Sequence, residues 1–305
     1  MWLVQQCYIE ELDKSGEFKE DPPHIYMIAR QPRVLLDPHS FKINDNLMKV
    51  CFKVQQEDTF KVGELRLFLP PDTPKLYLDC SYPYTEFSLK DQQGVEFGRY
   101  KVVLLLAQTN SLYSDLSELL SLEILYVGQS YGTEGARTAA ERLQKHSTLQ
   151  NIYSESIKRS PDKEIWLLLF SFDQVQILTI DPKQPIYEVS LEDNNKHIQK
   201  AINTEITEQQ RINFTEAALI RYFQPEYNEM FKNNFPSPAH KTYSECYDLD
   251  LNTVMVELQT KEIGFMLRSA KVPPKWDHFV IFPLHSQEER KSMFELAGLI
   301  ESEKP

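Results

Sequence analysis

The sequence predicts a mixed α/β (α+β) protein in which a small central sheet is flanked by helices. Three observations support this class. Over residues 91–235, apolar segments of strand length alternate with segments of helical period. Residues 1–90 are rich in β-branched and aromatic side chains and are divided by turns that contain proline. Residues 236–305 hold three short apolar segments and a final capped helix. We therefore expect a β-rich domain at 1–90, a central domain at 91–235 and a mixed C-terminal extension at 236–305.

Composition excludes several classes of protein. With 41% hydrophobic and 26% charged residues, the chain is typical of globular proteins and unlike disordered ones. No apolar run reaches the roughly 20 residues that cross a membrane, and the N-terminus lacks the pattern of a signal peptide. The four cysteines are scattered without a CxxC pair, which argues against a disulfide framework or a zinc site. These features predict a cytoplasmic protein with no membrane contact.

The formal net charge of −12 bears on the kind of partner. The acidity is spread over all three predicted regions, so neither end of the chain is a basic module. This argues against simple non-specific adhesion to nucleic acid, which depends on Lys and Arg that neutralise phosphates. It does not exclude an enzyme that acts on nucleic acid, because local patches and a bound cation matter more than the sum.

The N-terminal region is expected to form a small sandwich or barrel-like unit. Its apolar segments are short and closely spaced, as in compact all-β domains, and the segment at 48–54 alternates roughly. The expected strands are residues 2–9, 25–29, 47–54, 64–69 and 75–80.

The central region begins with an apolar run at 102–107 that has the length and composition of a buried strand. A helix is expected at 114–122 and a further strand at 124–128. The residues after the second strand, 129–135, form a polar loop that matches neither a P-loop nor GxGxxG.

A helical pattern follows at 138–145 and is closed by His146. Arg142 and His146 are four residues apart and therefore share one face. By themselves these residues favour a solvated arginine and a histidine that complements the negative end of the helix dipole.

The rest of the chain supplies strands at 165–172 and 174–180, a loop at 181–203 and a helix at 206–223 that carries Glu216. In isolation, Glu216 could be a first-turn carboxylate that complements the helix dipole. The C-terminal strands either return to the N-terminal unit or extend the central sheet. The expected C-terminal elements are strands at 253–258, 264–267 and 278–282 and a helix at 286–299.

Four motifs in a fixed order resemble the GIY-YIG nuclease superfamily over roughly the middle half of the chain. They are Tyr126-Val-Gly128, the Arg142 and His146 pair, the Glu216 helix, and Pro225-Glu-Tyr-Asn228. In that family the preceding strand carries Gly-Ile-Tyr. The nearest match in this chain is Gly98-Arg-Tyr100, which requires an insertion at 109–123. The resemblance implies a GIY-YIG-like sheet in the central domain.

The resemblance also implies a metal-dependent endonuclease that hydrolyses DNA in restriction, defence or repair. Glu216 would hold one Mg²⁺ or Mn²⁺, and Arg142 would clamp the scissile phosphate with its planar fork. Tyr100 or Tyr126 would take the proton of the attacking water, with His146 hydrogen-bonded to the base. Asn228 would bind a water or a phosphate oxygen, or brace Glu216.

Two other classes of function compete with this interpretation. The first is a GIY-YIG-like scaffold with weakened chemistry that acts as a binding or regulatory protein. The second is an α/β interaction protein whose motif match is accidental, in which case Tyr126, Arg142, His146 and Glu216 would not line one cleft. For a nuclease, the acidic surface further predicts a partner protein that delivers DNA.

Overall fold

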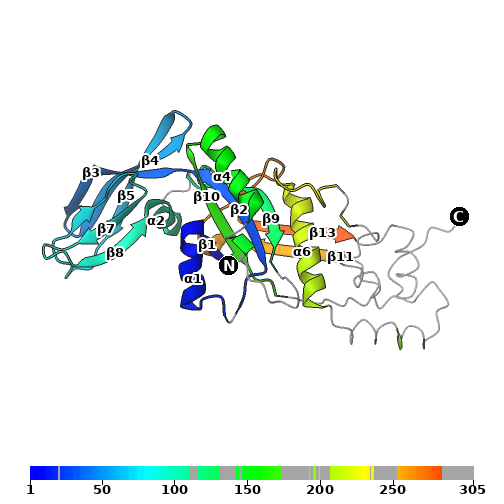
Figure 1. Cartoon of the computed structure of the whole chain (residues 1–305). Helices are drawn as coiled ribbons and strands as arrows, with labels where there is room; N and C mark the ends of the chain where they lie inside the picture. Colours follow the sequence, from blue (N-terminus) through cyan, green and yellow to red (C-terminus); the bar gives the residue numbers. More distant parts are fainter. Residues whose placement is uncertain are drawn as a thin grey trace, which may run out of the picture.

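The computed structural model describes residues 1–19, 21–109, 116–130, 142–143, 146–173, 207–233, 235–236 and 253–283, with positions 192, 195, 196 and 199. Over these residues the protein is mixed α/β and rich in sheet. A five-stranded sheet occupies the middle of the molecule, and a second, smaller β unit projects from it (Figure 1).

The central sheet joins segments that lie far apart in the sequence. Its strand order is β1 (Trp2–Val4), β10 (Lys163–Phe170), β2 (Ile25–Pro32), β9 (Leu122–Gln129) and β12 (Leu267–Arg268). All neighbours are antiparallel except β12, which runs parallel to β9. Strands β2 and β10 are apolar almost without interruption because both of their faces are covered.

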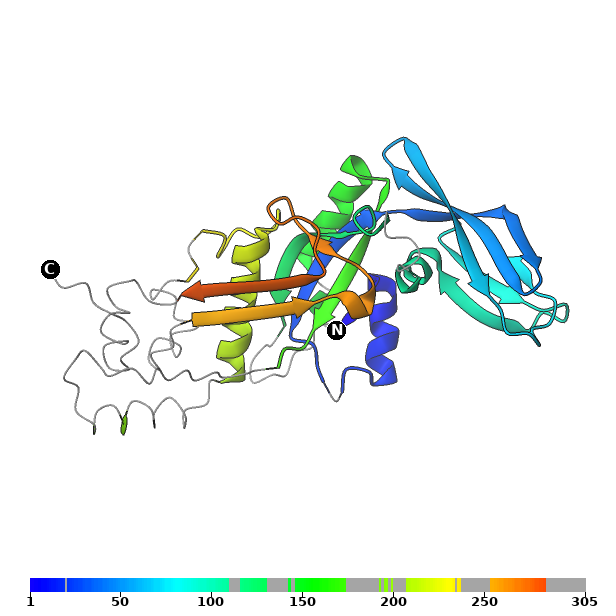
Figure 2. The ribbon, with the colours of Figure 1, turned by 180° about the vertical axis from the view of Figure 1, so that it is seen from behind.

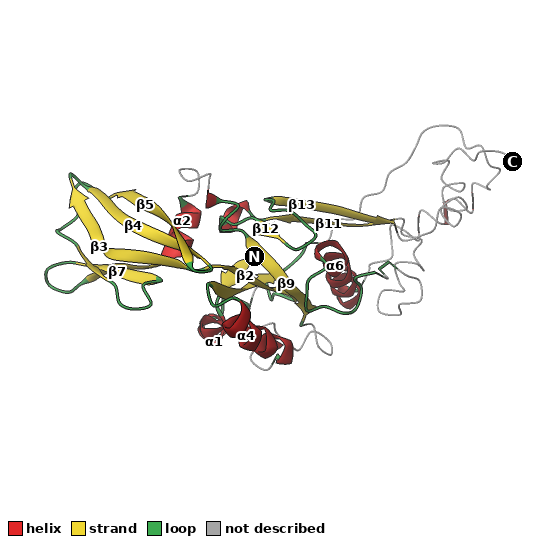
Figure 3. Ribbon diagram, turned by 90° about the horizontal axis from the view of Figure 1, so that it is seen from above, coloured by secondary structure: helices red, strands yellow, loops and turns green. Residues whose placement is uncertain are grey.

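Different elements cover the two faces of this sheet (Figure 3). Helices α1 (Ile9–Ser15) and α4 (Ser147–Arg159) pack on one face. The other face is covered by α2 (Val102–Gln108), α6 (Glu208–Phe223) and a hairpin. The hairpin consists of β11 (Thr253–Gln259) and β13 (Asp277–Pro283) and crosses in front of the sheet in Figure 2.

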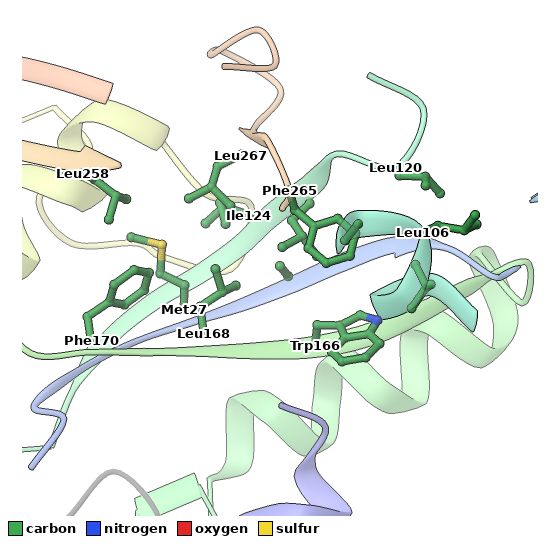
Figure 4. Packing of buried hydrophobic residues seen from close by; sticks show 14 of the residues in the cluster. Met27, Leu106, Leu120, Ile124, Trp166, Leu168, Phe170, Leu258, Phe265 and Leu267 are labelled. Atoms are coloured by element: carbon green, nitrogen blue, oxygen red, sulfur yellow. The ribbon is translucent and has the colours of Figure 1, made fainter. Parts of the chain in front are cut away.

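The larger core lies on the face that carries the hairpin. Figure 4 shows Met27 of β2 with Leu168 and Phe170 of β10 on the same side, pointing toward Leu258 of β11. Each of these side chains is almost inaccessible to solvent. Their burial removes apolar surface from water, which stabilises the layers at about 25 cal/mol per Å².

A β unit is inserted between β2 and β9. One sheet has the order β3 (Val34–Asn44), β4 (Leu47–Gln56) and β5 (Thr59–Phe68). The other has the order β6 (Tyr77–Asp79), β7 (Glu86–Lys90) and β8 (Glu96–Lys101). The two sheets form facing layers in Figure 1, with Phe52 and Phe87 buried in the same core. Two 3₁₀ turns elsewhere span Gln6–Tyr8 and Lys261–Ile263.

The prediction that residues 1–90 form one β-rich domain is wrong for the first part of this range, up to the end of β2. Strands β1 and β2 belong to the central sheet, and the β-rich unit is an insertion that begins at β3. Local sequence pattern predicts where a strand occurs but not which strand it pairs with. The burial of β2 on both faces is the feature that marks it as a central strand.

The apolar run at 102–107 is a helix and not a strand. Val102, Val103, Leu105 and Leu106 are all buried within α2. A short apolar run has no polar positions to reveal its period, so a buried helix and a buried strand look alike in sequence. Of the helix expected at 114–122, residues 114–115 lie outside the described part, and Leu122 already belongs to β9.

Several other predictions are confirmed. The strand at 165–172 is β10, the helix at 206–223 is α6, and two of the C-terminal strands form the β11–β13 hairpin. The third, expected at 264–267, overlaps the observed strand β12 at Leu267 alone, and β12 extends the central sheet beside β9. The strand at 174–180 and the helix at 286–299 lie outside the described residues, as does most of the segment at 181–203. Within the described helices, none has both the length and the apolar composition to cross a membrane.

Candidate active site

The pairing of β2 with β9 brings two tyrosines together at one end of the central sheet. Tyr26 pairs with Gly128, and Ile28 pairs with Tyr126. The register shifts between Ile28 and Ala29, which leaves Leu125 as an extra residue on β9. A β-bulge of this kind turns consecutive side chains toward the same face. Here it places Leu125 on the same face as Tyr126. Tyr126 itself is two residues from Gly128, the partner of Tyr26, so it lies diagonally beside Tyr26 with ring centroids 6.1 Å apart.

Gly128 makes room for both rings. A Cβ atom at this position would lie 2.6 Å from the Tyr26 hydroxyl and 2.7 Å from Cε1 of Tyr126. Such distances are far inside van der Waals contact. The glycine of Tyr126-Val-Gly128 is therefore required by the tyrosine on the neighbouring strand.

His146 lies over the same two rings, 5.6 Å from Tyr26 and 5.2 Å from Tyr126 between centroids. It is the N-cap of α4, where its side chain accepts a hydrogen bond from the backbone N–H of Leu149. The expected helix at 138–145 that His146 would close lies mostly outside the described residues, and the structure shows that His146 begins α4. The cap holds the imidazole in place over the tyrosines.

This capping bond determines where the histidine proton lies. A backbone N–H can only donate, so Nδ1 of His146 is the acceptor and the neutral ring carries its proton on Nε2. Nε2 lies 2.8 Å from the Tyr26 hydroxyl oxygen. His146 therefore donates to Tyr26.

Arg142 donates to the same oxygen, from Nε at 3.1 Å. The Tyr26 oxygen thus accepts two hydrogen bonds, and the proton of Tyr26 is directed away from both donors. Two donors, one of them charged, favour the ionised form of a phenol. Burial acts more strongly in the opposite direction and raises the pKa of Tyr26 well above its ordinary value, an effect that Tyr126 reinforces and Arg142 reduces.

Glu216 completes the cluster from α6. Thr207 caps this helix, with its side chain accepting from the N–H of Gln210. The Glu216 carboxylate accepts a hydrogen bond of 2.8 Å from the side-chain amide of Gln129, at the end of β9. The same amide nitrogen donates to Asn213, also at 2.8 Å. One glutamine therefore fixes the carboxylate relative to the helix and the strand.

Burial raises the pKa of Glu216 to about 7, although the Gln129 hydrogen bond and the charge of Arg142 both lower it. The charge of Glu216 in turn contributes to raising the pKa of Tyr126, where burial is the larger cause. Glu216 and the two tyrosines are thus close enough for their charges to interact.

Asn228 has a different role from the ones expected. It is buried, its amide oxygen accepts from the N–H of Val127 at 2.9 Å, and its amide nitrogen donates to the carbonyl of the same residue at 2.8 Å. Tyr227 adds a backbone bond to the carbonyl of Leu125 at 3.0 Å. The segment after α6 therefore attaches to the edge of β9, and Asn228 holds Tyr126-Val-Gly128 in position.

Tyr100 does not belong to this cluster, and the prediction that placed it there is corrected. It lies on β8 in the inserted unit, opposite Phe87, and its side chain is partly exposed. The position expected for the first tyrosine is occupied by Tyr26, in the sequence His24-Ile25-Tyr26. The four other expected residues Tyr126, Arg142, His146 and Glu216 do converge.

Sequence reasoning thus missed Tyr26 and Gln129. An aromatic residue in a strand buried on both faces was the available signal for Tyr26, but nothing local connected it to Tyr126. Gln129 follows Gly128 directly and was read as the start of a polar loop. Its role depends on the position of α6, which comes much later in the chain.

The residues present fit a single hard divalent cation. Glu216 is only partly exposed, receives its Gln129 hydrogen bond from a neutral amide, and offers carboxylate oxygens of the kind that Mg²⁺ prefers. Among the described residues, no three of the types His, Cys, Asp and Glu gather to form a cage.

The chain was compared with family models, with curated proteins and with solved structures, and none of the three comparisons returned a match. The geometry of the cluster is therefore the basis for assigning a function.

Proposed function

We propose that this protein is a GIY-YIG-like, metal-dependent endonuclease that hydrolyses DNA phosphodiester bonds. The observation that carries the proposal is the convergence of Tyr26, Tyr126, Arg142, His146 and Glu216 from four separate elements. An accidental match of short motifs would not be expected to bring these side chains together. Because Tyr26 lies beside Tyr126, it can take the place of the tyrosine that the family carries on the preceding strand, for which Tyr100 was the nearest match in sequence.

Tyr26 is the proposed general base. Its oxygen accepts from His146 and Arg142, so its own proton is not held by either. Loss of that proton to solvent would leave a phenolate that both donors stabilise, against the burial that raises the pKa of Tyr26. The phenolate would accept a proton from the water that attacks phosphorus. Tyr126, beside it, would hold this water or a non-bridging oxygen.

Arg142 is the proposed phosphate ligand. Nε is used by Tyr26 and the guanidinium also bonds to the hydroxyl of Tyr126, so its remaining N–H groups would serve the phosphate oxygens. The same side chain would therefore support the base and offset the charge that develops on the phosphoryl group. This double role makes Arg142 sensitive even to replacement by lysine.

Glu216 is the proposed ligand of Mg²⁺ or Mn²⁺. The bound cation would offset negative charge on the phosphoryl oxygens and on the leaving oxygen. Gln129 would orient the carboxylate through its 2.8 Å bond, and a carboxylate with a raised pKa would lose its proton as the cation binds. We also propose that DNA is the substrate and that a partner protein helps to deliver it, since the chain is strongly acidic.

Cleavage of supercoiled plasmid and of single-stranded DNA, with Mg²⁺ or Mn²⁺, tests the proposal. Wild type is compared with Glu216→Gln, which keeps the side-chain shape and its contact with Gln129. We expect the variant to lose about 1000-fold or more in rate, because a metal ligand contributes several kcal/mol at the transition state. Glu229→Gln is the matched control, since Glu229 is an exposed glutamate shortly after α6.

Circular dichroism and melting temperature verify that each variant folds. Equal cleavage by wild type and Glu216→Gln would contradict the proposal. Absence of cleavage by the wild type on both DNAs with both metals would favour the scaffold with weakened chemistry, and binding partners would then be sought.

A further inference from the structure

The outer face of the inserted unit carries three cations directly opposite one another across three strands. Lys42 of β3 pairs with Lys49 of β4, and Lys49 pairs with Arg66 of β5. Residues paired in this way point to the same face of a sheet. Lys49 lies between the buried residues Met48 and Val50, so this face is the one turned away from the core. We call Lys42, Lys49 and Arg66 the cation row.

The cation row costs stability. Neighbouring strands lie about 4.8 Å apart, and like charges directly opposite each other repel. In the part of the chain that the structure describes, neither Lys42 nor Lys49 forms an ion pair, while Arg66 pairs with Glu64 at 2.6 Å. Three neighbouring cations on adjacent strands are unexpected in a chain whose net charge is −12.

Another cation and two exposed aromatic residues lie on the same face as the cation row. Lys53 lies on the same face and pairs with Asp37 at 3.2 Å. Phe68, which is 84% exposed, follows Arg66 on β5 at the same face, and Phe60 is 47% exposed at the other end of that strand. Cations interleaved with exposed aromatic rings are the surface that binds nucleic-acid backbone and bases.

We propose that the outer face of β3, β4 and β5 binds the phosphate backbone of the DNA substrate, through the cation row. The inference rests on the proposed nuclease function for the identity of the ligand. Charge complementarity selects this ligand, because DNA presents a regular line of phosphates and the row is a local cationic patch on an acidic protein. Figure 3 shows β3, β4 and β5 side by side as one layer at the end of the molecule away from α6.

The distance along β2 sets the minimum length of DNA that can contact both the tyrosine cluster and the inserted β unit. The insertion leaves β2 at Pro32, six residues after Tyr26, which corresponds to about 20 Å of strand. Because DNA rises about 3.4 Å per base pair, the substrate must extend at least about six base pairs beyond the scissile bond to contact the insertion. The row would therefore strengthen the binding of long substrates and leave the chemical step unchanged.

Fluorescence anisotropy with a labelled 30-base-pair duplex tests the inference. All proteins carry Glu216→Gln, so the DNA stays intact. The test variant is Lys42→Gln/Lys49→Gln/Arg66→Gln. The control, Lys75→Gln/Lys158→Gln/Lys271→Gln, removes the same charge from exposed lysines elsewhere. We expect the test variant to bind about 100-fold more weakly at 0.1 M salt, with a salt slope smaller by about 3, and the control to bind within a few-fold of its parent.

Stability provides an independent readout. Neutralising a row of like charges should keep or raise the melting temperature, so weaker binding could not be ascribed to unfolding. Equal losses in the test and control variants would overturn the inference, as would unchanged binding by the test variant. Either result would leave the nuclease proposal intact if the enzyme with Glu216 still cuts plasmid. A test variant that binds DNA normally but no longer binds vesicles with anionic lipid would assign the face to a membrane and also overturn the inference.

Discussion

Two carboxylates lie at opposite ends of the β2–β9 pair, and their surroundings differ sharply. Glu123, near the start of β9, accepts hydrogen bonds from Arg30 at 2.9 and 3.0 Å and from Arg268 at 2.9 Å. Glu216, at the other end, is held by the neutral amide of Gln129. Burial raises the pKa of both, but at Glu123 the two guanidiniums more than compensate and the pKa lies below its ordinary value. Glu216 keeps a pKa of about 7.

The difference separates a structural carboxylate from one available for binding. The charge of Glu123 is already matched by cations from β2 and β12, so it joins three strands of the sheet. The charge of Glu216 is offset only in part by Gln129 and Arg142, which supports the proposal that a divalent cation binds there. A buried carboxylate without a matching cation beside it is unfavourable for folding, and such groups concentrate at functional sites.

The largest expected effect in this comparison is on stability at Glu123. Glu123→Gln leaves two partly buried guanidiniums facing a neutral amide and should lower the free energy of unfolding by about 3 kcal/mol. Urea denaturation at pH 7 measures this change. A loss below about 0.5 kcal/mol would show that the three-strand ion network does not stabilise the sheet.

Glu216→Gln is the same substitution at the other carboxylate, and it should raise the free energy of unfolding at high pH where Glu123→Gln lowers it. Because the folded-state pKa of about 7 lies above the ordinary 4.5, the folded protein binds this proton more tightly than the unfolded chain. The stability of the wild type should therefore fall as pH rises from 4.5 through 7. At pH 8 the variant should be more stable by about 1–2 kcal/mol, and at pH 4 the two should agree.

The next largest effect is expected on the cleavage rate, when Tyr26, the proposed base, is compared with Tyr100, the candidate from the sequence. Tyr26→Phe removes the hydroxyl that His146 and Arg142 contact, and should slow DNA cleavage about 100-fold or more. Tyr100→Phe, on β8, should cut like the wild type. Rates under single-turnover conditions measure both variants. Loss of activity in Tyr100→Phe alone would restore the assignment made from the sequence.

A smaller effect is expected at Gln129, the neutral partner that distinguishes Glu216 from Glu123. Gln129→Leu removes a hydrogen bond that favours the ionised carboxylate, so the pKa of Glu216 should rise further. Affinity for Mg²⁺ should fall about tenfold, and the pH midpoint of Mg²⁺ binding should move above that of the wild type. Titration calorimetry from pH 6 to pH 9 measures both quantities. Gln150→Leu, at an exposed position of α4, is the control.

Much of the fold and of the site was predictable from the sequence because the signals are local. Helix α6 and strand β10 follow from periodicity and apolar length. Tyr126, Arg142, His146 and Glu216 were identified through the resemblance of their short motifs to a nuclease family. Helix α2 was mistaken for a strand because an uninterrupted apolar run carries no period.

The roles of individual polar atoms were less predictable. His146 caps the start of α4, a role that the sequence did not suggest, and Asn228 holds the backbone of Val127 instead of facing substrate. A side chain at a helix boundary can cap either helix, and an amide can serve backbone or ligand equally well. Spacing along the chain does not distinguish these cases.

By itself, the sequence determined the class of fold and the α6 helix, which depend on neighbours within a few residues, and its ordered motifs indicated four of the five side chains that converge. The tertiary structure decided the identity of the first tyrosine, because Tyr26 and Tyr126 are one hundred positions apart and meet only through the pairing of β2 with β9. It also decided the roles of Gln129 and of the cation row, which depend on strand register and helix packing. Contacts between distant segments arise from the burial of whole faces, and that information is distributed over the entire chain.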